Sequence, residues 1–137
     1  MDYLYYSLYQ FYTKVIKVQK NFAPVINIAG VIALVQMALI FSIINAIIYL
    51  DYGKEVAVPY HGLLSGVVGL VLYYFNEKHF RKRESDILKK IGLNTDVKKW
   101  CIVISSFMII ALTLWFWMED GLYRIICFLI GREANLL

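Results

Sequence analysis

The sequence lacks the short motifs by which common enzymes bind phosphate, a metal or an acyl group. No G-x-x-x-x-G-K, G-x-G-x-x-G, H-E-x-x-H, C-x-x-C or G-x-S-x-G pattern occurs in its 137 residues. The nearest approach to catalytic chemistry is His79-x-Arg81-x-Arg83, imaginable as an RNA-cutting pair, but no second His stands nearby as a base. We therefore expect a protein that is not an enzyme, and we identify no small-molecule substrate.

Cysteine is scarce, and acidic residues are missing from the long apolar runs. Cys101 and Cys127 flank the last run, so we expect them near opposite membrane faces, beyond the ~7 Å between Cα atoms that a disulfide tolerates. His61 has no Cys, Asp or second His at ligand spacing, so we predict no metal and no cofactor. The missing intramembrane carboxylates count against a proton-coupled transporter.

Apolar residues, by contrast, make up 61% of the chain and collect in long runs. A helix needs ~20 such residues to cross the hydrocarbon core. We predict an all-α integral membrane protein forming a single membrane domain. Its segments are an amphipathic interfacial helix (1–22), three transmembrane helices (23–50, 58–77 and 100–118), a basic cytoplasmic helical hairpin that extends the second span (78–99), and a short extracytoplasmic tail (119–137).

The N-terminal segment, residues 2–21, gathers its polar side chains on one narrow stripe with Lys14 and Lys17. Leu, Val, Ile and many Tyr residues cover the rest of the helix. A wide apolar face with a Lys edge is typical of a helix lying in the headgroup plane. The same face would serve equally well to pack on the other helices, and the sequence favours neither arrangement.

Three amides, Asn27, Gln36 and Asn45, lie inside the first apolar run. Asn27 and Asn45 are five helical turns apart and share a face, whereas Gln36 lies two and a half turns from each on the opposite face. Amides in hydrocarbon need partners, because an unpaired one is costly. We interpret them first as helix–helix hydrogen bonds; a pore or ligand path is the alternative.

The second span carries overlapping notches of small residues, Gly62-x-x-x-Gly66 and Ser65-x-x-x-Gly69. Such notches let helix backbones approach closely in a membrane. Contact inside the monomer and contact between copies of the chain would both use them.

A basic stretch follows, in which Phe80, Ile87, Leu88 and Ile91 recur at helical spacing. One helix from Pro59 to Ile91 would be ~50 Å long, ~20 Å more than the hydrocarbon core, which predicts a cytoplasmic stalk. We expect its cations to contact anionic lipid or a protein partner. They are Lys78, Arg81, Lys82, Arg83, Lys89 and Lys90.

Charge distribution predicts the orientation. Of 14 Lys and Arg residues, 11 fall in the N-terminal segment and the second loop. The positive-inside rule then places the N-terminus in the cytoplasm and the C-terminus outside the inner membrane. An anionic leaflet is a simpler partner for these charges than nucleic acid. The tail holds an apolar stretch, Leu122 to Ile130, which we expect to be a short interfacial helix or an extension of the third span.

The stretch LVLYYFNEKHFRKRESDILKK, residues 70–90, resembles a pattern in small multi-span bacterial membrane proteins of unknown function. In these an aromatic-Asn helix end leads into a basic amphipathic helix. Some proteins of this size and shape act as membrane effectors beside phage-defence genes, so the resemblance implies a defence or toxin-like role without assigning any residue.

The function predicted is therefore self-association to form or regulate a membrane assembly, with a triggered, membrane-permeabilising, pore-forming effector as one form. A structural or adaptor subunit of a larger membrane complex is the alternative, and a holin-like lysis protein is a further one.

Overall fold

The computed structural model describes residues 1–15, 24–52 and 61–131, and every regular element within them is helical. The all-α class is thus confirmed. The end of the predicted N-terminal helix (16–21), the start of the predicted second span (58–60) and the last residues of the tail (132–137) lie outside the described residues. The elements are α1 (Asp2–Gln10), the π-helical η1 (Phe11–Val15), α2 (Pro24–Tyr52), α3 (His61–Gly92), α4 (Asp96–Met118) and α5 (Gly121–Leu129).

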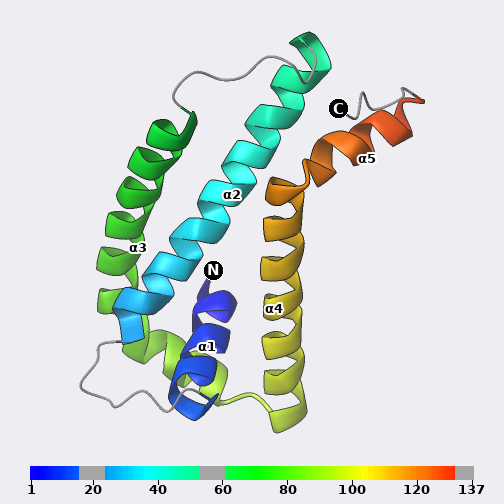
Figure 1. Ribbon diagram of the computed structural model, residues 1–137. Helices are drawn as coiled ribbons and strands as arrows, with labels where there is room; N and C mark the ends of the chain where they lie inside the picture. The colour runs from blue at the N-terminus through cyan, green and yellow to red at the C-terminus, as the bar shows by residue number, and fades with distance from the viewer. Residues whose placement is uncertain (16–23, 53–60, 132–137) are drawn as a thin grey trace.

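The central helix is α2, which contacts α1, α3, α4 and α5. It begins at Pro24, whose missing N–H falls in the first turn, where helical N–H groups have no partner in any case. Figure 1 shows α3 and α4 on opposite sides of α2, with α1 among the three at the end where α4 begins. At the other end, α5 leads outward from α4 and contacts α2.

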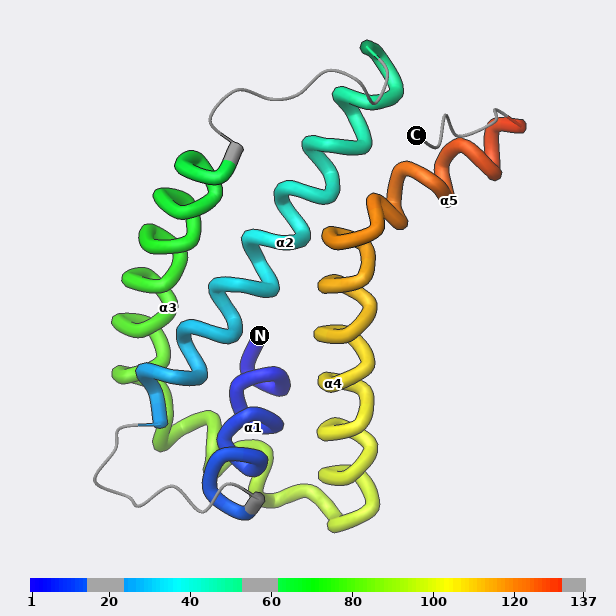
Figure 2. Tube along the Cα trace, viewed as in Figure 1, coloured from blue at the N-terminus to red at the C-terminus, as the bar shows by residue number. Residues whose placement is uncertain are grey.

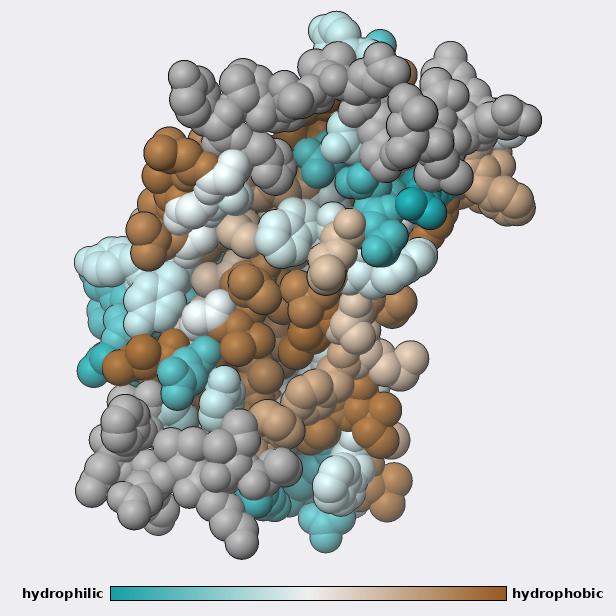
Figure 3. Space-filling model, in the orientation of Figure 1, coloured by the Kyte–Doolittle hydropathy of each residue, from teal (hydrophilic) through white to brown (hydrophobic). Residues whose placement is uncertain are grey.

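Two helices, α2 and α4, are long and apolar enough to cross a membrane. The mostly apolar part of α3 is shorter: its 14 residues from Gly62 to Phe75 cover about 21 Å at 1.5 Å per residue. On the face drawn in Figure 3, hydrophobic side chains gather over the middle of the molecule, where α2 and α4 lie. By length and composition, α2 and α4 are therefore candidate membrane spans.

The first helix, α1, is enclosed by the others. Five consecutive residues, Leu4 to Leu8, are buried, although consecutive residues point in different directions around a helix. A helix lying on the bilayer surface would leave one side open to the headgroups, whereas α1 contacts α2, α3 and α4. Of the two arrangements predicted for this segment, the structure shows packing on the other helices.

The long helix predicted through the basic stretch is present in its described part as α3, but its second half is not a free stalk. Figure 2 shows that α3 bends and runs across under α1 toward the start of α4. The bend buries Phe80, Ile87 and Ile91 in one cluster with residues of α1 and α2. A projecting stalk would leave these three side chains in water, which would forfeit their burial free energy.

A sharp corner separates α4 from α5, so the tail does not extend the last span. Asp120 adopts a left-handed conformation with φ 50°. At the next residue, Gly121, an added Cβ would lie 2.8 Å from Cδ1 of Phe116 and 3.0 Å from Cζ3 of Trp115. α5 then crosses the end of α2, where the Tyr123 ring meets Tyr49 edge-on at a centroid distance of 5.5 Å.

Candidate functional site

The most specific polar contact between the long helices joins α2 to α3. Nδ2 of Asn76 donates a hydrogen bond to Oε1 of Gln36, with the two atoms 2.7 Å apart. Both side chains are half-buried. The bond satisfies two groups that would be costly to leave unpaired in hydrocarbon, and so it gives Gln36 a role in helix packing. The sequence alone offered no reason to select Asn76 as the partner.

The other two amides of α2 do not join this pair. Asn45 is buried toward the far end of the helix, and Asn27 is exposed near its start. Gln36 lies on the opposite face of α2 from both, as the spacing required. Within the described part of the chain, the three amides therefore do not line one polar track.

The small residues of α3 divide into two groups. At Gly69 an added Cβ would lie 3.3 Å from Sδ of Met37, so this notch serves the contact between α3 and α2. At Gly62 and Gly66 an added Cβ would meet no atom of a described residue within 4 Å, and both glycines are exposed. Between them, Ser65 Oγ donates to the carbonyl of Gly62 at 2.9 Å. Gly62 and Gly66 thus form an unfilled notch on the surface of α3.

A buried pair of hydroxyls ties α1 to α4. The Oγ atoms of Ser7 and Ser106 lie 2.9 Å apart. Each is also within hydrogen-bond distance of a carbonyl of its own helix, Tyr3 at 2.9 Å and Ile102 at 2.8 Å. Serines in apolar helices usually bond back to their own carbonyls, so no sequence signal indicated this contact.

Tyr5 lies at the centre of the cluster formed by α1, α2 and the bent half of α3. Its ring is fully buried and stacks on Phe80 at a centroid distance of 4.6 Å. Its hydroxyl makes no hydrogen bond of full geometry with a described residue, but the Glu84 carboxylate lies close enough to act on it. Burial, and then the negative charge of Glu84, raises the pKa of Tyr5 well above its ordinary value of 10.0. The hydroxyl therefore stays protonated, and Tyr5 acts in packing.

The six predicted contact cations are all exposed on α3. Arg81 pairs with Glu77 one turn earlier, and Arg83 Nη2 lies 3.4 Å from the Asp2 carboxylate, which links the bent half of α3 to α1. The Lys78 ammonium sits 6.0 Å from the centroid of the Tyr74 ring. The remaining three form no ion pair with any described residue: Lys82, Lys89 and Lys90.

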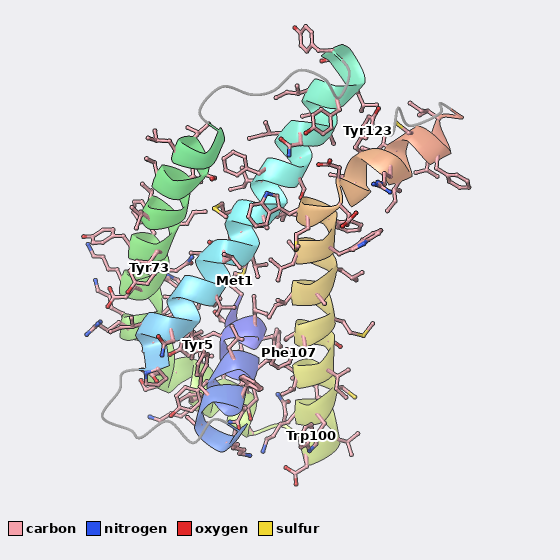
Figure 4. All side chains as sticks on the ribbon, in the orientation of Figure 1. Met1, Tyr5, Tyr73, Trp100, Phe107 and Tyr123 are labelled. Carbon is pink, nitrogen blue, oxygen red and sulfur yellow. The ribbon has the colours of Figure 1, made fainter. Side chains whose placement is uncertain are left out.

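A cavity of about 220 Å³ opens between α1–η1 and the first half of α4. Its walls are mostly aromatic or aliphatic, and two lysines stand at its rim. Figure 4 shows Phe107 between α1 and α4, and Trp100 at the lower end of α4. The lining residues are Tyr6, Gln10, Phe11, Lys14, Asp96, Lys99, Trp100, Val103 and Phe107.

Across residues 1–15, 24–52 and 61–131, no group of three or more His, Cys, Asp and Glu side chains is placed to hold a metal ion. Cys101 is exposed at the start of α4, and Cys127 is buried in α5. In the comparisons with known proteins, no family model, no curated protein and no solved structure matches the chain. Function is therefore inferred from the chemistry of the surfaces described above.

Proposed function

We propose that this chain is a non-enzymatic integral membrane protein that self-associates and forms or regulates a membrane assembly. The observation that carries the proposal is the exposure of α4. This 23-residue apolar helix buries only Ser106 and Thr113. Large apolar side chains are exposed along its length, among them Ile104, Met108 and Leu112. An apolar surface of this extent is unfavourable in water and matches the hydrocarbon of a bilayer.

In this proposal α2 and α4 cross the inner membrane, and the apolar half of α3 crosses beside them. The N-terminus and the bent half of α3 are cytoplasmic, and α5 lies on the outer side. The charge distribution supports this orientation, because 11 of 14 Lys and Arg residues belong to the segments assigned to the cytoplasm. Local thinning of the bilayer and snorkelling of Lys78 accommodate the short apolar stretch of α3.

Self-association uses the notch formed by Gly62 and Gly66. Lipid is as apolar as the helices, so helix contact in a membrane relies on close backbone approach at small residues. Gly69 already receives Met37 of the same chain. Gly62 and Gly66 remain open, and a helix of a second copy fits there. Because the amides of α2 do not form one track, any permeation path would lie between copies of the chain rather than inside one.

An adaptor subunit of a larger membrane complex is the second candidate. It is favoured by Lys82, Lys89 and Lys90, which are exposed on the cytoplasmic half of α3 without an ion pair among the described residues. These ammonium groups are free to meet an acidic protein surface. In this case the exposed notch and the exposed side of α4 would meet partner helices.

The test is the mass of the full chain in nanodiscs, with and without Gly66→Ile. The wild type should be an oligomer and Gly66→Ile a monomer. Gly30→Ile is the matched control, because Gly30 of α2 also has no described residue within 4 Å of an added Cβ, and it should leave the oligomer intact. An unchanged mass for Gly66→Ile would refute self-association through this notch.

A second measurement separates the two candidate functions. Membrane potential and growth are followed after the chain is produced alone in cells. Loss of polarisation that Gly66→Ile prevents would support a permeabilising assembly. If the chain is an oligomer but the membrane stays polarised under every trigger tried, the permeabilising assembly is rejected and the adaptor role is favoured.

A further inference from the structure

We infer that the cavity between α1–η1 and α4 binds one anionic phospholipid of the cytoplasmic leaflet. One acyl chain of the lipid lies in the cavity, and the phosphate of the lipid binds Lys14 and Lys99. The inference rests on the proposed membrane embedding and names a ligand for it. The cavity belongs to neither the glycine notch nor the basic half of α3.

The walls suit an acyl chain. Tyr6 and Phe11 line one side, and Val103 and Phe107 of α4 line the other. The rings of Phe11 and Phe107 meet edge-on at a centroid distance of 5.3 Å. A volume of about 220 Å³ is below the range of about 300–1,000 Å³ typical of pockets for drug-sized ligands. It therefore takes part of one chain, and the rest of the lipid stays in the bilayer.

The rim carries the charge that selects the headgroup. Lys14 is exposed and forms no ion pair with a described residue. Lys99 Nζ lies 3.5 Å from Oδ1 of Asp96, whose side chain is 92% exposed. The Lys99 side chain is 29% exposed, but a pair this long with an exposed carboxylate contributes little. Two ammonium groups against one carboxylate leave one net positive charge, which complements the single negative charge of a phosphodiester.

The local backbone explains how both parts of the site meet. η1 is a π-helical turn, a feature found often at functional sites. It carries Phe11, which lines the wall, and Lys14, which stands at the rim. Across the cavity, Trp100 is 67% exposed at the start of α4, as expected of an indole ring at the membrane interface. The site thus has an apolar interior for the acyl chain, an aromatic margin at the depth of the lipid's interfacial region and a cationic mouth for its phosphate.

The test uses Trp100 as the reporter in the full chain, with Trp115→Phe and Trp117→Phe removing the other indoles. The protein is reconstituted in phosphatidylcholine vesicles that contain equal mole fractions of acyl-brominated phosphatidylglycerol or acyl-brominated phosphatidylcholine. Brominated phosphatidylglycerol should quench Trp100 at a several-fold lower mole fraction. Lys14→Gln with Lys99→Gln should abolish this preference. Lys82→Gln with Lys90→Gln removes the same charge away from the cavity and should preserve it.

Filling the cavity gives an independent arm. Val103→Phe fills part of the cavity without adding a second indole beside the Trp100 reporter. Circular dichroism checks that the variant keeps its helix content. It should weaken the preference while both lysines remain. Equal quenching by the two brominated lipids in the reporter protein would overturn the inference. So would an equal loss of preference in the Lys82/Lys90 pair, because that result means general surface attraction.

Two further quenching results would overturn different parts of the inference. Stronger quenching by brominated phosphatidylethanolamine than by phosphatidylglycerol would overturn the anionic ligand, since a zwitterionic headgroup would then use Asp96 as well. No quenching by any brominated lipid would instead refute the proposed membrane embedding and remove the premise of this site.

Discussion

Asn76 of α3 donates its side-chain hydrogen bond to Gln36 of α2 across 2.7 Å. The two residues are 40 positions apart in the chain, so the contact exists only when the two helices pack in one register. Beyond this bond, α2 and α3 meet through apolar contacts such as Met37 against Gly69. The amide pair is therefore the directional element of an otherwise non-directional interface.

Removing one member of the amide pair should cost more than removing both. Gln36→Leu or Asn76→Leu leaves the partner amide half-buried and unpaired, which should lower the free energy of unfolding by roughly 1–3 kcal/mol. The double variant should recover part of the loss, because no amide is left without a partner. Unfolding in mixed micelles, arranged as a double-mutant cycle, measures the coupling.

Asn27→Leu is the control for the amide pair, because Asn27 is exposed. It should change stability by less than about 0.5 kcal/mol. Strict additivity of the two single variants would contradict a role for the pair in helix register.

The buried hydroxyl of Tyr5 makes a second prediction. It makes no hydrogen bond of full geometry with a described residue, with the Glu84 carboxylate as its only nearby acceptor among the groups that act on it, so Tyr5→Phe removes a poorly satisfied polar atom and keeps the stack on Phe80. The free energy of unfolding should rise by roughly 1–3 kcal/mol. Tyr5→Ala should lower it by about 3–5 kcal/mol, because the ring is fully buried. A clear loss of stability in Tyr5→Phe would contradict this and mean that the hydroxyl is stabilised by a hydrogen bond to Glu84.

Alkaline pH tests the same residue in another way. The pKa of Tyr5 is raised above 10.0 in the folded protein, so between pH 10 and that raised value the unfolded state loses a proton that the folded state keeps. Stability should be independent of this group below pH 10 and fall above it by about 1.4 kcal/mol per pH unit. Tyr5→Phe should flatten that slope, measured against Tyr3→Phe, which removes a hydroxyl from an exposed ring of the same helix.

The helical periods in the sequence were sufficient to predict the long elements. Apolar length predicted α2 and α4, and the recurrence of Phe80, Ile87 and Ile91 predicted that α3 continues past the membrane stretch. Periodicity does not show in which direction the second half of α3 runs. A protein partner, lipid or a bend of the helix could each bury these three apolar side chains. Only the position of α1 shows that the helix bends and covers Tyr5.

The pairs that fix the fold were harder to foresee. Gln36 stood out because amides are rare in apolar runs, but Asn76 lies in the middle of α3 just past its apolar stretch, where a polar residue is ordinary. Ser7 and Ser106 carry no signal, since either hydroxyl can bond to its own helix. The division of the glycines, with Gly69 inward and Gly62 and Gly66 outward, depends on the rotation of α3 about its axis, which the small-residue spacing leaves undetermined.

The corner between α4 and α5 should depend on the absence of a side chain at residue 121. In Gly121→Ala the new Cβ would lie 2.8 Å from Cδ1 of Phe116, so a ring or the backbone must move. We expect a loss of about 1–3 kcal/mol, the usual range for overpacking, with a change in Trp fluorescence from the displaced Trp115. Gly30→Ala is the control: no atom in the described part of the chain lies within 4 Å of its added Cβ, so the gain in helix propensity should stabilise it by up to about 1 kcal/mol. Equal stability changes in the two variants would contradict the close contact at the corner.

The enclosed position of α1 is open to a direct chemical test. The Ser7 and Ser106 hydroxyls are 2.9 Å apart, so Ser7→Cys with Ser106→Cys should form a disulfide on mild oxidation once Cys101 and Cys127 are replaced by Ser and Ala. The bond would appear as a mobility shift in non-reducing gels, reversed by a thiol reductant. Ser7→Cys with Ser105→Cys is the matched control, because Ser105 is exposed on the same helix and lies about 100° around the helix axis from Ser106. Efficient cross-linking of the first pair alone would show that α1 docks among the helices in the membrane. Equal cross-linking of both pairs, or of neither, would mean that α1 leaves this position, and the lipid cavity that it forms with α4 would then lose one wall.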